Sequence, residues 1–137
     1  MNFESAENIS NNEESRERAE ENINLVIFKN RLEAFLERQI GFESTMSTHI
    51  SHLDERIIEV KERLAELVKA IKFENQSDLE NWSVVIKDMD DLIRYYEGIR
   101  DTIKEITIYI SEEIEKSRME LIDINKALER NLEEQSN

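Results

Sequence analysis

The sequence contains no proline and no cysteine, and its 137 residues include only two glycines, Gly41 and Gly98. Average proteins contain roughly 5% proline and 7% glycine, so the residues that usually mark turns and strand ends are almost missing. Without cysteine, disulfides and thiolate metal sites are excluded. Charged residues make up 36% of the sequence, and Glu, Lys, Arg, Leu and Ile dominate its periodic regions. This composition is typical of long helices, and the length fits one domain or one extended module.

Positive charge is also scarce, since the formal net charge is −14. This balance argues against direct binding of nucleic acid or of anionic membrane surfaces, because both require clustered Lys and Arg. No apolar run approaches the roughly 18 residues of a membrane span, and the polar N-terminus does not resemble a signal peptide. We therefore expect a cytoplasmic protein that does not insert into membranes.

Residues 1–12 are polar, acidic and aperiodic, and we predict a disordered tail there. A helical pattern follows over residues 13–134. Its first arm, about residues 13–72, has an apolar seam with alternating spacings of three and four residues. The predicted seam residues are Leu25, Phe28, Leu32, Phe35, Gln39, Phe42 and Met46, then Ile50, Leu53, Ile57, Val60, Leu64, Leu67 and Ile71.

The two halves of this seam join by an extra step of four between Met46 and Ile50. Such a step in a heptad pattern is a stutter, which locally unwinds a coiled coil. Gly41 and a stretch rich in Ser and Thr lie nearby, and these residues lower helix propensity. We expect the helix to continue through this region, because no proline interrupts it.

A turn over residues 73–77 separates the two arms. The sequence Ser77-Asp78-Leu79-Glu80 after it has the pattern of a capping box, in which Ser77 accepts the amide of Glu80. The second arm, about residues 78–134, has a seam whose phase shifts near Gly98. We expect its seam residues to be Leu79, Trp82, Ile86, Met89, Ile93, Tyr96, Ile99, Ile103, Ile106, Ile110, Ile114, Leu121, Ile124 and Leu128.

These arms predict an all-α fold, a long antiparallel helical hairpin or coiled coil. Helix breaks near Gly41 and Gly98 would instead produce a four-helix bundle. Apolar residues beside the seam, such as Ile23, Val26 and Ile27, exceed what a two-helix hairpin needs. Burying each would contribute about 1.5–3 kcal/mol, so we expect other helical proteins to cover them, in a hetero-oligomer or a homodimer.

Residues with catalytic or metal-binding potential are few. His49 and His52 share a helical face, but a metal site needs three or four converging ligands. Asp88-Met89-Asp90-Asp91 lacks the glycine and the distal Glu of a calcium loop. No phosphate-binding loop or nucleophilic triad is present. We expect no enzymatic activity, no cofactor and no metal.

Aromatic and arginine side chains, which are enriched at interface hot spots, cluster in the second arm. The candidate partner-binding residues are Trp82, Arg94, Tyr95, Tyr96 and Arg100.

The segment Asp78-Leu79-Glu80-Asn81-Trp82 follows one coiled-coil arm and opens the next. It resembles the Asp-x-Glu-Asn-Trp segment of the first subunit of the lysosome-related-organelle biogenesis complex. Ile86 and the Asp88-Met89 pair are also similar, although that pair falls one residue early and the chain after Trp82 is longer than in that family. The resemblance implies a small helical subunit of a cytosolic hetero-oligomer that helps to sort endosomal cargo.

The expected function is a non-enzymatic coiled-coil subunit of a multi-protein assembly, with a role in endosomal and lysosomal membrane trafficking implied by the resemblance. The alternative is an acidic helical inhibitor or decoy that binds a basic protein surface. The net charge of −14 suggests this alternative.

Overall fold

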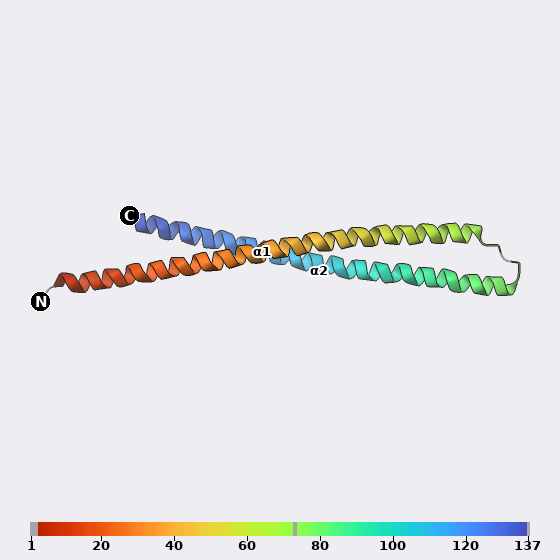
Figure 1. Ribbon diagram of the computed structural model, residues 1–137, viewed down its shortest axis with the longest axis horizontal. Helices are drawn as coiled ribbons and strands as arrows, with labels where there is room; N and C mark the ends of the chain where they lie inside the picture. The colour runs from red at the N-terminus through yellow and green to blue at the C-terminus, as the bar shows by residue number, and fades with distance from the viewer. Residues whose placement is uncertain (1–2, 73, 137) are drawn as a thin grey trace. The chain divides into compact units, whose positions relative to one another are not determined.

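The computed structural model is an all-α helical hairpin of two helices, α1 (Phe3–Ala70) and α2 (Gln76–Ser136), which run in opposite directions (Figure 1). It describes residues 3–72 and 74–136, and the side chains within 10–72 and 74–134. The predicted hairpin is confirmed. The alternative of a four-helix bundle is wrong, because both helices continue through Gly41 and Gly98.

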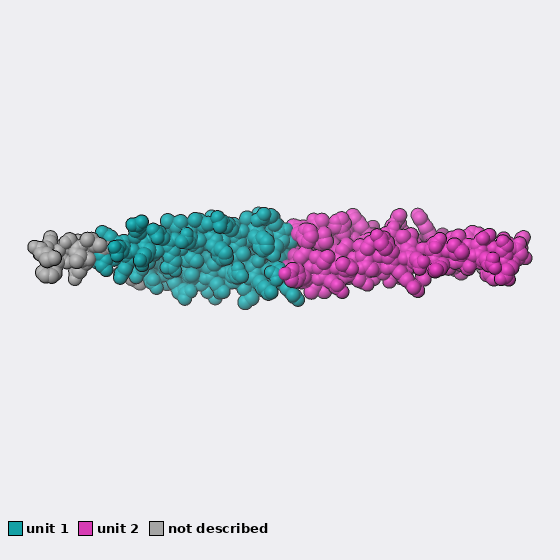
Figure 2. Space-filling view, turned by 90° about the horizontal axis from the view of Figure 1, so that it is seen from below, with its two compact units in different colours: residues 1–40, 112–137 teal, residues 41–111 magenta. Residues whose placement is uncertain are grey.

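Contacts between the helices divide the chain into two units, which are coloured separately in Figure 2. Unit 1 combines residues 1–40 with 112–137, and unit 2 is the segment 41–111, which contains the turn. Each unit therefore contains one part of α1 and one part of α2.

Both glycines lie inside helices and face open space. Apart from the surrounding helix backbone, no atom lies within 4 Å of the position that a Cβ would occupy at Gly41 or Gly98, and neither has a positive φ. A threonine hydroxyl one turn later donates to each glycine carbonyl, from Thr45 to Gly41 at 3.0 Å and from Thr102 to Gly98 at 2.9 Å. With no proline present, the lower propensity of glycine costs only about 1 kcal/mol at each site and does not end the helix.

The prediction of a disordered tail over residues 1–12 differs from the structure, in which α1 begins at Phe3. Residues 3–12 are helical, and residues 1 and 2 lie outside the described part. Ser, Asn and Glu are acceptable in a helix when no glycine or proline interrupts them, and α1 simply extends its established helix by these turns.

The cap of α2 also differs from the sequence prediction. The side chain of Asn75 accepts a hydrogen bond from the amide of Asp78 at 2.9 Å, and its carbonyl accepts one from Leu79 at 3.3 Å. Asn75 is therefore the N-cap, and Ser77 lies inside the first turn. Asp78 in that turn complements the positive end of the helix dipole.

The seam of unit 2 is the best-packed part of the protein. Ile57 and Val60 of α1 are buried against Ile93 of α2, and Ile57 is only 3% exposed. Leu64, Met89 and Tyr96 pack around this cluster. These positions agree with the predicted seam, and their spacings of three and four are those of a heptad repeat.

Elsewhere the predicted seam needs two corrections, because the repeat continues without a stutter or a phase shift. In α1 the seam positions are Lys29, Leu36 and Glu43, and the neighbouring phenylalanines, Phe28, Phe35 and Phe42, are about half exposed. In α2 the seam positions are Arg100 and Thr107, whereas Ile99 and Ile106 lie beside the seam. In each case the prediction chose a more apolar residue that lies one position before the true seam residue.

Polar residues at the seam are accommodated by partners on the opposite helix. In unit 1, the Ser117 hydroxyl, which is buried among Ile114 and Leu121, donates to Gln39 at 3.2 Å. In unit 2, Ser111 donates to Glu43. Among the described residues, no buried side-chain nitrogen or oxygen lacks a hydrogen-bond partner. The seam is therefore stable without being uniformly apolar.

Candidate partner-binding surface

Unit 2 presents two different edges beside its seam. In a heptad the seam consists of positions a and d, with positions e and g on either side. The e positions from residue 47 to residue 111 are polar, apart from Val68 near the turn. They are Ser47, Asp54 and Lys61 on α1, and Ser83, Asp90, Glu97, Lys104 and Ser111 on α2.

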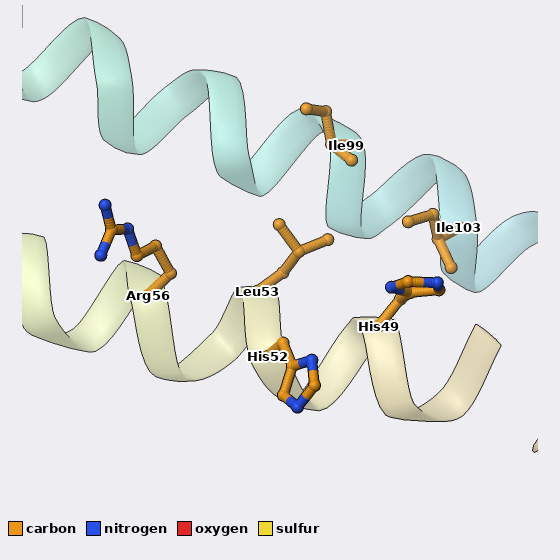
Figure 3. A pocket seen from close by; sticks show the side chains of 6 residues that line it. All are labelled: His49, His52, Leu53, Arg56, Ile99 and Ile103. Atoms are coloured by element: carbon orange, nitrogen blue, oxygen red, sulfur yellow. The ribbon is translucent and has the colours of Figure 1, made fainter. Parts of the chain in front are cut away.

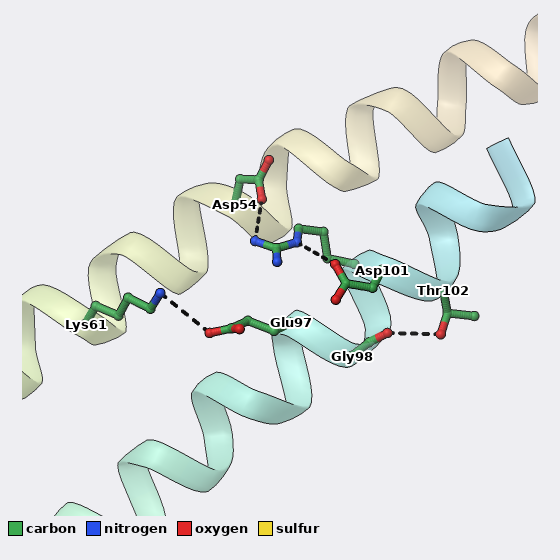
Figure 4. Close-up of polar contacts among 7 residues, drawn as sticks. Asp54, Lys61, Glu97, Gly98, Asp101 and Thr102 are labelled. Carbon is green, nitrogen blue, oxygen red and sulfur yellow. Dashed lines mark hydrogen bonds and ion pairs between the residues drawn. The ribbon is translucent and has the colours of Figure 1, made fainter. Parts of the chain in front are cut away.

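Ion pairs cross between the helices on this e edge. Arg100 bonds to Asp54 at 3.2 Å and to Asp101 at 3.2 Å, and Lys61 lies 3.5 Å from Glu97 (Figure 4). The hydrogen bond from Arg100 to Asp54 raises the pKa of the Arg100 guanidinium, with Asp101 adding to the effect. Asp54, Lys61 and Glu97 on this edge therefore already have partners on the opposite helix.

The opposite side of unit 2 has a different chemistry. We call it the acid-free flank and define it by the g and c positions of α1 over residues 42–56 and of α2 over residues 95–109. On α1 these are Phe42, Thr45, His49, His52 and Arg56. On α2 they are Tyr95, Ile99, Thr102, Ile106 and Tyr109. None of these ten residues is acidic, whereas the next c position of α1 is Glu59 and the preceding c position of α2 is Asp88.

A hollow of about 510 Å³ lies on this flank between α1 and α2. Figure 3 shows His49, Leu53 and Arg56 on one helix and Ile99 and Ile103 on the other, with the side chains of Leu53 and Ile103 directed toward the space between the helices. A second hollow along α2 shares Ile99 and Ile103 with the first. The floor of the flank is therefore apolar and accessible.

The rim of the flank is basic on its α1 side. Arg56 lies 3.5 Å from Glu59, which borders the flank. The Tyr96 oxygen accepts a hydrogen bond from Arg56 and raises the pKa of the guanidinium, and Glu59 adds to this effect. His49 and His52 are exposed beside it. The rim thus offers hydrogen-bond donors that suit carboxylates.

The candidate partner-binding residues named from the sequence do not form one patch. Tyr96 and Arg100 occupy seam positions, where Tyr96 packs on the core and Arg100 is held by Asp54. Trp82 is also a half-buried seam residue, more than three turns earlier in α2. Arg94 and Tyr95 face outward and line the same hollow. Only Tyr95 belongs to the acid-free flank, with Arg94 beside it in an ion pair with Asp90 at 3.3 Å.

The flank residues that the sequence did not reveal have two origins. Phe42, Ile99 and Ile106 are predicted as seam residues, and His49 and His52 are rejected as a metal site without being assigned to a surface. Within the described ranges, no three His, Cys, Asp or Glu side chains gather in a way that could hold a metal. A heptad count extended from Ile57 would have placed Phe42, His49 and Arg56 on one edge.

Unit 1 also exposes apolar side chains. Ile23, Val26, Ile27 and Phe28 are each at least two-fifths exposed and point in different directions around α1, with Leu25 at the seam. Phe35 is 48% exposed, although Leu36 beside it faces α2. A helix that is apolar on several faces normally packs against more than one neighbour.

Comparison with family models, with curated proteins and with solved structures finds no match to this chain. In the ranges that the structure describes, neither helix has a stretch long and apolar enough to cross a membrane.

Proposed function

We propose that this chain is a non-enzymatic, protein-binding helical hairpin that acts as a subunit of a multi-protein assembly. The observation that supports this most is the difference between the two edges of unit 2. One edge has ion pairs between the two helices, and the other leaves aromatic and aliphatic side chains in solvent. An apolar surface beside a satisfied polar one is typical of a docking face.

The apolar surface of unit 1 supports the same proposal. Residues 23–28 expose Ile23, Val26, Ile27 and Phe28 at consecutive or nearly consecutive positions. Full burial of such side chains contributes about 1.5–3 kcal/mol each, so a partner that covers several of them gains considerable binding energy. The hairpin provides the rigid helices, and the side chains beside its seam provide the contacts.

The test is the behaviour of the purified chain alone. We expect it to associate nonspecifically and to bind a dye that reports exposed apolar surface. Serine in place of both Phe28 and Phe35 removes exposed area without changing the seam, so this variant should associate less while keeping its helical content. A wild-type chain that stays monomeric when concentrated and binds no dye would contradict the proposal.

A narrower part of the proposal is a role in endosomal and lysosomal membrane trafficking. It is supported by the resemblance of the segment around Asp78–Trp82, which opens α2 after the Asn75 cap. If this part is correct, the tagged chain co-fractionates with endosomal membranes and deletion of its gene missorts endosomal cargo. The trafficking role would be contradicted if the chain did not co-fractionate with such membranes and cargo sorting stayed normal after deletion of the gene.

The charge of −14 favours a second candidate, an acidic inhibitor or decoy for a basic protein surface. Its carboxylates are spread over the outward positions of both helices, as in α2 between Asp101 and Glu115. Binding of this kind weakens steeply as salt rises, because exposed charges are screened. An affinity for the native partner that does not change between low and high salt would exclude this candidate.

A further inference from the structure

We infer that the acid-free flank of unit 2 binds an amphipathic helix of another protein, one whose apolar stripe is bordered by Asp and Glu. This inference rests on the proposed function and specifies the chemistry of the partner. The partner helix lies along the groove between α1 and α2, so that three helices pack together in unit 2.

The shape of the flank suits a helix. The hollow between the helices has apolar walls formed by Leu53, Ile99 and Ile103, and it continues along α2 into a second hollow. Along α2, Ile99 and Ile106 repeat at the seven-residue spacing of a heptad. A partner with apolar side chains at spacings of three and four can insert them between these residues, as knobs enter holes in a coiled coil.

The charge of the flank indicates an acidic partner. Arg56 is its permanent cation, and His49 and His52 add further donors on the same side. No flank residue carries a carboxylate, but Glu59 at the next c position of α1 lies 3.5 Å from Arg56 at the border. Acidic residues beside the partner's apolar stripe would supply acceptors for His49 and His52, and for those of the five N–H donors of Arg56 that Glu59 and Tyr96 do not use.

The charges of the flank also disfavour a second copy of the flank as the occupant. Two copies packed flank to flank would bring together His49, His52 and Arg56 of each copy, and Glu59, the carboxylate at the border, already pairs with Arg56 of its own copy. The net charge of −14 adds a repulsion between whole copies. A foreign helix is therefore the occupant that the flank fits.

The test uses two synthetic helical peptides of about four heptads, with Leu and Ile at the a and d positions. One has Glu at every e and g position and the other has Lys there, which also keeps each peptide from pairing with itself. Binding of each labelled peptide to the full chain is followed by fluorescence anisotropy at about 0.15 M salt. The net charge of the chain alone would favour the Lys peptide, whereas the flank predicts tighter binding of the Glu peptide.

Variants of the chain locate the binding. Ile106→Glu, on the flank, should weaken binding of the Glu peptide about tenfold or more, and Ile108→Glu, on the outer face of the same helix, should not. Arg56→Glu should weaken it by a similar factor, whereas Lys87→Glu makes the same change of charge on the outer face and should have little effect. Tyr95→Glu, at a side chain that is 64% exposed, is a further flank variant that leaves the seam unchanged. Circular dichroism verifies that each variant is folded.

Preference for the Lys peptide, equal binding by flank and outer-face variants, or no binding by either peptide would overturn the inference. Loss of binding only on substitution of Phe28 and Phe35 would also overturn it, while leaving the proposed function intact because docking would then occur on unit 1. If the isolated chain in addition exposed no apolar surface to dye, the proposed function would fail as well.

Discussion

In unit 1, the side-chain amide of Asn131 on α2 donates a hydrogen bond to the side-chain oxygen of Asn22 on α1 at 2.7 Å. Both residues occupy seam positions, where apolar side chains would bury more area. A polar pair inside a coiled-coil seam can select one alignment of the helices, because other alignments leave the polar groups unpaired. We therefore expect Asn22 and Asn131 to fix the register of the helices at a cost in stability.

Replacing both asparagines by leucine should raise the free energy of unfolding by about 1 kcal/mol or more, because apolar burial replaces a polar pair. Asn131→Leu alone should be less favourable than the double change, since it leaves Asn22 without its partner. Urea denaturation measures both effects. The double variant should also form additional oligomers in light scattering, and a single unchanged species would indicate that the pair does not select register.

The uninterrupted heptad makes a sharp prediction for two adjacent residues. Leu36→Ala should lower the free energy of unfolding by about 2 kcal/mol, because Leu36 faces α2 at the seam. Phe35→Ala should change it much less, although phenylalanine is larger, because that side chain is half exposed. Equal losses, or a larger loss at Phe35, would favour the stutter that the apolar pattern suggests. Thermal and urea denaturation of the two variants decide between these arrangements.

The N-cap of α2 offers a similar comparison. Asn75→Ala removes the side-chain acceptor of the Asp78 amide, so it should cost about 1 kcal/mol. Ser77→Ala should be close to neutral, because Ser77 lies inside the first turn. Urea denaturation of both variants measures the two losses of unfolding free energy. A larger loss for Ser77→Ala than for Asn75→Ala would show that Ser77 is the N-cap, as its capping-box pattern predicts.

Alanine at Gly41 and Gly98 should stabilise the protein. Both positions are open and have ordinary helical φ values, so each change should add about 0.5–1 kcal/mol to the free energy of unfolding. The two effects should add, since the residues lie far apart along the helices. Ala34→Gly, at another exposed position of α1, is the matched control and should destabilise by a similar amount. Loss of stability at either glycine would indicate that a local bend is required there.

Much of the fold could be predicted from composition and periodicity. The absence of proline, the spacing of Ile57, Val60 and Ile93, and the turn near residues 73–77 sufficed for an all-α hairpin. The exact seam could not be predicted in the same way. The apolar pattern of one helix favours Phe35 over Leu36 and Ile99 over Arg100. It contains no information about the opposite helix, which supplies the partner that makes a polar seam residue acceptable. Asp54 provides that partner for Arg100, and Gln39 for Ser117.

The candidate site depended on the same information. Aromatic and arginine content in α2 pointed to residues 82–100, but three of the five named residues face the seam. The acid-free flank combines side chains from α1 and α2 that are more than 30 residues apart in sequence, such as His49 and Ile99. Only the register of the two helices brings them together, so one-dimensional pattern analysis could not define the surface.

The central claim is that a foreign acidic helix docks on the acid-free flank, and site-specific photo-crosslinking in cells tests it most directly. A photoreactive amino acid replaces Ile106 on the flank or Ile108 on the outer face of the full chain, at positions 43% and 60% exposed. We predict a discrete adduct from position 106 that mass spectrometry maps to an amphipathic helix bordered by Asp and Glu, and none from position 108. Equal adducts at both positions, an adduct only from 108, or an adduct to a second copy of this chain would contradict the claim.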